Sequence, residues 1–127
     1  MSIDYTERAR ALVGTPFRPQ GRGELGLDCV GVAIATFGLR DVRANYRLRG
    51  DHAGEVREYL RAVFRRVPTA QVRPGDLKLM QVADDQIHLG VRTRAGFVHA
   101  HAGVRRVVET HGNPERRVLG VYRARRR

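Results

Sequence analysis

Apolar residues recur at helical spacing in three segments of the first half of the chain. Residues 4–13 predict a short helix with Asp4 as its N-cap, ended by the Gly-Thr-Pro of residues 14–16. Residues 29–37, CVGVAIATF, are apolar all round and predict a buried central helix that a glycine ends. Residues 54–65 predict a third, amphipathic helix. The positions available for buried faces are Tyr5, Ala9, Leu12 and Val13 in the first helix, and Val56, Leu60, Val63 and Phe64 in the third.

Beyond Pro68 the pattern changes to short apolar runs separated by turn residues, which is typical of strands. The glycine-rich residues 17–26 read as a loop. Helices first and strands afterwards favour an α+β fold in which N-terminal helices pack on a C-terminal antiparallel β-sheet. The predicted strands are 77–80, 87–92, 97–100, 104–109 and 118–123, and the predicted turns are 83–85, 95–96 and 112–114.

Length and composition are those of an ordinary globular protein. The 127 residues, 42% hydrophobic and 29% charged, predict a single domain over residues 1–127 whose last few residues form a basic tail. No apolar run approaches the roughly 20 residues of a membrane helix. The N-terminus lacks the pattern of a secretory signal peptide.

The charge is strongly positive. Lysine and arginine total 24 against 13 acidic residues, giving +11, and Lys78 is the only lysine. Such a charge predicts attraction to polyanions: nucleic acid, teichoic-acid-like wall polymers or an acidic protein partner.

The only cysteine, Cys29, lies where the glycine-rich loop meets the apolar helix. A helix N-terminus gathers unpaired N–H groups and the positive end of the helix dipole, which favours a thiolate. Cys29 is therefore a candidate nucleophile. The alternative is a small buried hydrophobe, a common fate of a lone cysteine.

Two histidines fall on neighbouring predicted strands. A tight hairpin at residues 93–95 would set His88 and His99 side by side on one face. A nucleophilic cysteine needs a base within hydrogen-bond reach and a third group that orients the base, and these residues supply all three parts. The alternative is that they are unrelated polar strand residues. His52 and His111 are expected in loops, with no role.

His99 and His101 are two residues apart, so a regular strand would place them on the same face. This spacing suits a zinc site, but such sites need three or four ligands and no further set is evident. We therefore expect no metal.

Several short motifs, in order, resemble the NlpC/P60 cysteine peptidase domain, and most closely its short phage-encoded members, the cell wall peptidases. Each motif is weak alone, but five in the right order at fitting intervals make a specific resemblance over nearly the whole chain. The motifs are residues 14–17 (GTPF), 27–32 (LDCVGV), 74–77 (PGDL), 88–91 (HLGV) and 97–100 (FVHA), with Gly103-Val104 fitting the segment that follows.

The resemblance implies a papain-like α+β fold and hydrolysis of amide bonds in peptidoglycan stem peptides, typically between D-γ-glutamyl and diaminopimelate or lysine. By position, Cys29 matches the nucleophile, His88 the general base and His99 the residue that orients His88. Asp28 matches the acid that commonly precedes the cysteine. Neither a metal nor an organic cofactor is implied.

One residue departs from the family pattern. Phe17 stands where the family usually has a tyrosine, whose hydroxyl is thought to help the substrate or the oxyanion. Loss of one oxyanion donor costs about 10²–10³ in rate. The backbone N–H of Cys29 could still serve, so Phe17 bears on efficiency more than on mechanism. Val30, where many bacterial members have serine, fits the phage-type members.

The resemblance also implies a place of action. In phage-type members the peptidase is a virion component at the tail tip, assembled in the host cytoplasm, which opens the cell wall for DNA entry. We expect other tail-tip or hub proteins as partners. The arginines at residues 116–117 and 123–127 could dock an acidic tail protein or extend as a solvated tail.

Three other functions stay open. A structural tail-tip protein could keep the fold with weak or no activity, and Phe17 favours this alternative. A basic nucleic-acid-binding module would suit the charge, but aromatic residues are only 6% and no stacking platform or recognition helix is evident. An acyltransferase or an amidase with another substrate could use the same catalytic residues.

Overall fold

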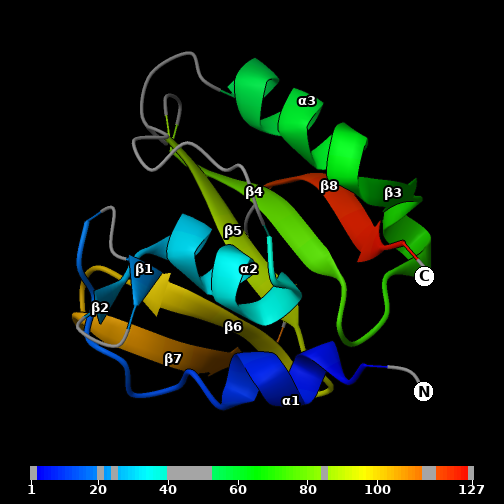
Figure 1. Cartoon of the computed structure of the whole chain (residues 1–127). Helices are drawn as coiled ribbons and strands as arrows, with labels where there is room; N and C mark the ends of the chain where they lie inside the picture. The colour runs from blue at the N-terminus through cyan, green and yellow to red at the C-terminus, as the bar shows by residue number, and fades with distance from the viewer. Residues whose placement is uncertain are drawn as a thin grey trace.

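The computed structural model describes residues 3–19, 22–23, 26–39, 53–83, 86–112 and 117–125. In these ranges it consists of helices packed on a six-stranded antiparallel sheet of order β3-β8-β4-β5-β6-β7, with a two-stranded hairpin, β1-β2, at one side (Figure 1). The helices are α1 (Tyr5–Arg10), α2 (Cys29–Phe37), α3 (Ala53–Val63) and the 3₁₀ turn η1 (Thr69–Gln71). The strands are β1 (Arg22–Gly23), β2 (Gly26–Leu27), β3 (Phe64–Val67), β4 (Leu77–Ala83), β5 (Gln86–Arg92), β6 (Gly96–His101), β7 (Arg106–His111) and β8 (Arg117–Ala124).

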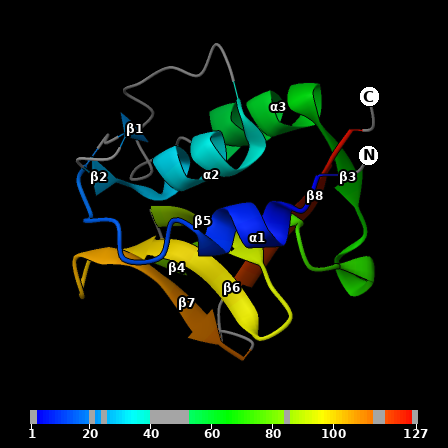
Figure 2. The ribbon, with the colours of Figure 1, turned by 60° about the horizontal axis from the view of Figure 1, so that its bottom comes forward.

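The apolar helix α2 lies at the centre of the molecule. It packs against α1, β5 and β6, and all three α-helices lie on one side of the sheet (Figure 2). Asp28 is its N-cap, with one carboxylate oxygen accepting a hydrogen bond from the Gly31 N–H at 2.8 Å. Gly38 ends it at φ 64°, a left-handed conformation that glycine adopts without strain. The predicted bounds of this helix are confirmed.

Alternating residues of the sheet supply the other half of the core, since successive side chains of a strand point to opposite faces. Each large apolar side chain buried in this way stabilises the fold by about 1.5–3 kcal/mol. Aromatic contacts connect the helices to the far strands, with ring centroids 4.8 Å apart for Tyr5–Phe37 and 5.1 Å apart for Phe37–Phe64. The sheet residues in this core include Leu77, Leu79, Leu89, Val91, Val98, Ala100, Val107 and Tyr122.

The predicted fold class and antiparallel strands are confirmed, but two predictions near the third helix and the glycine-rich loop are wrong. The third helix ends at Val63, and Phe64–Val67 forms β3, which pairs with β8. Phe64 continues the helical spacing of the preceding residues, so periodicity alone could not show where pairing takes over. The loop at residues 17–26 contains the β1-β2 hairpin and a bridge between Phe17 and Leu27.

Smaller differences concern strand ends and turns. The predicted first helix keeps Asp4 as its N-cap but ends at Arg10. Strand β7 starts at Arg106, because residues 102–105 form a turn in which Arg105 has φ 61°. His111 is the last residue of β7 rather than part of a loop. His52 and the predicted turn residues 84, 85, 113 and 114 lie outside the described residues.

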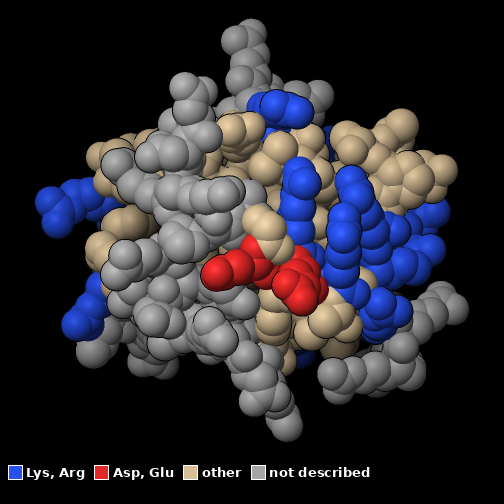
Figure 3. Space-filling view, turned by 90° about the horizontal axis from the view of Figure 1, so that it is seen from above, with Lys and Arg blue, Asp and Glu red and all other residues tan. Residues whose placement is uncertain are grey.

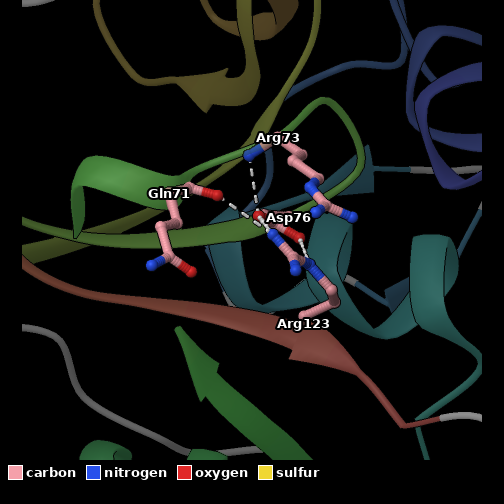
Figure 4. Close-up of polar contacts among 4 residues, drawn as sticks. All are labelled: Gln71, Arg73, Asp76 and Arg123. Carbon is pink, nitrogen blue, oxygen red and sulfur yellow. Dashed lines mark hydrogen bonds and ion pairs between the residues drawn. The ribbon is translucent and has the colours of Figure 1, made fainter. Parts of the chain in front are cut away.

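A partly buried ion pair joins Asp76, the residue before β4, to β8. The Arg123 guanidinium donates to both carboxylate oxygens of Asp76 at 2.8 Å and to the Gln71 carbonyl at 3.1 Å, and the Arg73 N–H also donates to Asp76 (Figure 4). The Asp76 side chain is 3% exposed and that of Arg123 21%. The hydrogen bond with Asp76 raises the pKa of Arg123, against an opposing effect of burial. Arg123 is thus held in the fold by Asp76 and Gln71, and docking of an acidic partner by the C-terminal arginines stays a prediction.

Replacing Asp76 tests this pair. Asp76→Ala should lower the free energy of unfolding by about 3 kcal/mol, because it leaves a partly buried guanidinium without its carboxylate. Urea unfolding measures the effect. As a control, Arg10→Ala removes the 3.2 Å pair with Glu109, in which Arg10 is 61% exposed, and should cost less than about 1 kcal/mol. Equal losses in the two variants would contradict the assignment.

Lys78 is the second residue of β4 and is buried, opposite Gly90 on β5 and Val121 on β8. Burial lowers its pKa from 10.5, and the nearby Arg92 charge lowers it further. The folded chain therefore holds the proton of Lys78 less tightly than the unfolded chain does, which makes the ammonium form a cost to folding.

Lys78→Met should accordingly raise the free energy of unfolding at neutral pH. The unfolded wild type binds more protons than the folded form in the window between the lowered pKa and 10.5. The free energy of unfolding of the wild type therefore rises with pH through that window, whereas that of the variant does not gain this contribution. The stability advantage of the variant should shrink as the pH approaches 10.5. Urea unfolding of both proteins across this range measures it. A gain that does not depend on pH would show that the charge is not its source.

Candidate active site

Cys29 is the first residue of α2 and only 3% exposed. Its place follows from local chemistry, because Asp28 caps the helix and the apolar residues after Cys29 draw the first turn into the core. The first-turn N–H groups of a helix have no helical acceptors, so they surround Cys29 with hydrogen-bond donors and positive potential. This position suits a thiolate, and the burial also suits the alternative of a packed thiol.

The strands β5 and β6 form a hairpin that opens toward its far end. Register pairs join them at Val91–Val98 and Arg92–Phe97, next to the turn. Away from the turn the two strands diverge, and α2 packs against both of them (Figure 1). The helix that begins at Cys29 therefore covers the pair of strands that carry His88 and His99.

The structure brings His88 and His99 together, as predicted. His88 Nε2 lies 2.8 Å from His99 Nδ1, and the two rings meet edge to face with centroids 5.0 Å apart. His99 is 2% exposed, and the Phe97 ring stacks on it at 4.3 Å. His99 is thus fixed by packing and polar contacts, and it can hold the His88 ring in one orientation. The roles assigned to Cys29 and the two histidines stay predictions.

Sequence analysis missed one member of this group. Thr110, on β7, has its Oγ1 2.7 Å from His99 Nε2. It lies one residue beyond the end of the predicted strand 104–109. The strand register would have identified it. Phe97 pairs with Thr110, and this pairing places the threonine on the same face as Phe97 and His99.

His101 has a different task. Its Nδ1 accepts hydrogen bonds from the backbone N–H groups of Gly103 at 3.0 Å and Val104 at 3.3 Å, which closes the turn between β6 and β7. This nitrogen is therefore engaged within the turn. Among the residues with described positions, no group of three or more His, Cys, Asp or Glu side chains is arranged to hold a metal ion.

Two further residues were predicted to contact the substrate or the oxyanion. Phe17 is partly buried against the core and bridges Leu27, two residues before Cys29. Its N–H donates to the Arg105 carbonyl at 2.9 Å, so the GTPF segment is held between the approach to Cys29 and the turn before β7. Asp28 is 8% exposed, and it accepts a hydrogen bond from the N–H of Gly31. Their part in binding a substrate stays a prediction.

In the described part of the chain, no helix is long and apolar enough to cross a membrane.

The fold resembles solved structures of NlpC/P60 domains. The NlpC/P60 domain of the peptidoglycan hydrolase SagA is 18% identical, with a TM-score of 0.62 over 85% of this chain and 86% of that one. The P60 domain of an M. avium subspecies paratuberculosis antigen is 20% identical, with a TM-score of 0.62 over 94% and 91%. The peptidoglycan hydrolase RipB from Mycobacterium tuberculosis is 19% identical, with a TM-score of 0.61 over 94% and 62%.

No protein-family model matches the chain, and no curated protein matches it in sequence. At these identities the likeness concerns the fold, which is the α+β papain-like arrangement of the NlpC/P60 domains.

A pair of substitutions separates the capping role of Asp28 from a role of its charge. Asp28→Ala should lower the free energy of unfolding by about 1 kcal/mol through loss of the N-cap, whereas Asp28→Asn keeps an oxygen acceptor and should change it by a few tenths at most. Thermal or urea unfolding measures both. A loss in Asp28→Asn as large as in Asp28→Ala would show that the carboxylate charge, rather than the cap, stabilises this site.

Proposed function

We propose that this chain is a cysteine peptidase that hydrolyses amide bonds in peptidoglycan stem peptides. The observation that carries the proposal is the hydrogen bond between His88 and His99 on the two strands covered by the helix that begins at Cys29. The motifs of the sequence support it, as does a fold shared with domains of the peptidoglycan hydrolases SagA and RipB.

In the proposed reaction Cys29 is the nucleophile and His88 moves the protons. His88 takes the proton of Cys29, and the thiolate attacks the carbonyl carbon of the stem-peptide amide. The backbone N–H of Cys29 stabilises the oxyanion at the start of α2. The C–N bond then breaks and His88 gives its proton to the leaving amine. A water activated by His88 hydrolyses the thioester, which releases the carboxylate and restores the thiol.

The finer part of the proposal concerns where the protein acts. We propose a phage tail-tip component, assembled with other tail or hub proteins in the host cytoplasm, that opens the wall for DNA entry. The resemblance of the motifs to phage-type members supports this role.

The arginines offer a contact for an acidic partner or wall polymer. Arginine side chains gather beside a small acidic group on the face that carries α3 (Figure 3). Arg61 lies on this helix, and Arg125 donates to the Arg61 carbonyl, which places the two arginines side by side. Arg117 is also exposed, on β8.

Digestion of purified peptidoglycan tests the proposed activity. The wild type should release fragments cut within the stem peptide, identified by mass spectrometry, and Cys29→Ala should release none while unfolding at nearly the same urea concentration. Residual cutting by Cys29→Ala would exclude the cysteine mechanism.

Two outcomes would favour the alternatives. If the folded wild type cuts nothing, a structural protein with the same fold becomes the better explanation. If it binds DNA without sequence preference and with a steep dependence on salt, a basic nucleic-acid-binding module becomes the better explanation. Detection of the protein in purified virions would test the tail-tip role separately.

A further inference from the structure

The His99 ring has polar partners on two sides, supplied by two different strands. His88 Nε2 lies 2.8 Å from its Nδ1, and Thr110 Oγ1 lies 2.7 Å from its Nε2. Side chains of β5, β6 and β7 therefore form one hydrogen-bonded chain across the sheet. Because His99 is 2% exposed, the hydrogen on its ring must be matched by protein partners rather than by bulk water.

We propose that Thr110 is a positioning residue that sets the tautomer of His99, and through it the nitrogen at which His88 accepts a proton. The inference rests on the proposed function for the role of His88. It goes further in assigning a task to a residue of β7, which acts through His99.

The direction of the chain follows from counting hydrogens. When His88 holds the proton of Cys29, both of its ring nitrogens carry hydrogen, so its Nε2–H donates to Nδ1 of His99. A neutral imidazole has a single N–H, so the hydrogen of His99 then lies on Nε2 and is donated to Thr110 Oγ1. Thr110 must act as the acceptor in this state.

The reverse direction would remove the base. If the Thr110 hydroxyl donated to His99 Nε2, the hydrogen of His99 would lie on Nδ1 and be donated to His88 Nε2. Neutral His88 would then carry its own hydrogen on Nδ1, the nitrogen with which it would meet the thiol. Thr110 as an acceptor therefore favours the one arrangement in which His88 can take up a proton.

The packing around Thr110 keeps its side chain next to the His99 ring. Thr110 pairs across the ladder with Phe97, whose ring stacks on His99. A Cβ at Gly96 would collide with the Thr110 carbonyl oxygen, so the glycine allows β6 and β7 to approach closely at this point. The branched side chain of threonine also has few rotamers, which helps to fix the hydroxyl.

Ring nitrogen NMR tests the proposal without relying on activity. Spectra of the ¹⁵N-labelled wild type, Thr110→Ser and Thr110→Val are compared at a pH where the histidines are neutral, with signals assigned through His88→Gln and His99→Gln. The wild type and Thr110→Ser should show the hydrogen of His99 on Nε2. Valine keeps the shape of threonine but offers the Nε2–H no acceptor. Thr110→Val should therefore shift the ratio of the two His99 tautomers toward Nδ1–H by roughly tenfold or more. Hydrogen on Nδ1 in the wild type, or the same ratio in all three proteins, would overturn the proposal.

Kinetics on peptidoglycan fragments give a second readout. Thr110→Val should lower kcat by about tenfold with KM little changed, and Thr110→Ser should recover most of the loss, since the substitution alters the proton acceptor rather than substrate binding. An unchanged kcat in Thr110→Val would count against the proposal. If the wild type itself proves inactive, the proposed function fails, and the NMR ratios still decide the role of Thr110.

Discussion

Burial of the apolar helix α2 is the constraint on which the rest of the structure depends. A helix that is apolar on every side must be covered on every side. Here α1 and the strands β5 and β6 cover it, with residues such as Val32 and Ala33 inside the core. The position of Cys29 is a consequence of this packing. As the first residue of a rigid, capped and buried helix, it is placed by the core rather than by a surface loop.

The same packing places the two strands that carry the histidines against this helix. Strands β5 and β6 pair next to their turn and then separate under α2. The His88–His99–Thr110 chain crosses three strands, so each member is oriented by a regular element and by its neighbours. Polar groups held on rigid elements keep their geometry better than groups on loops. The Asp76–Arg123 pair ties the residue before β4 to the end of β8.

The sequence could predict those parts of this arrangement that depend on local patterns of apolar and capping residues. The all-apolar run with a capping aspartate predicts α2, and the alternating runs after Pro68 predict the strands and the pairing of His88 with His99. The sequence could not show where the third helix gives way to β3, because Phe64 satisfies the periodicity of both elements. The sequence also could not identify contacts between residues that are far apart along the chain. Asp76 and Arg123 are 47 residues apart, and Thr110 becomes a neighbour of His99 only through the register of β6 and β7.

The reactivity of Cys29 tests most directly whether this packing produces a nucleophile. The rate of alkylation by iodoacetamide would be measured at pH 6 in the folded wild type, in the folded His88→Ala variant and in the urea-unfolded chain. If His88 and the start of α2 favour the thiolate, the folded wild type reacts faster than the unfolded chain although Cys29 is 3% exposed, and His88→Ala removes the excess. If the folded wild type reacts more slowly than the unfolded chain, and His88→Ala changes nothing, Cys29 is a packed thiol and not a nucleophile.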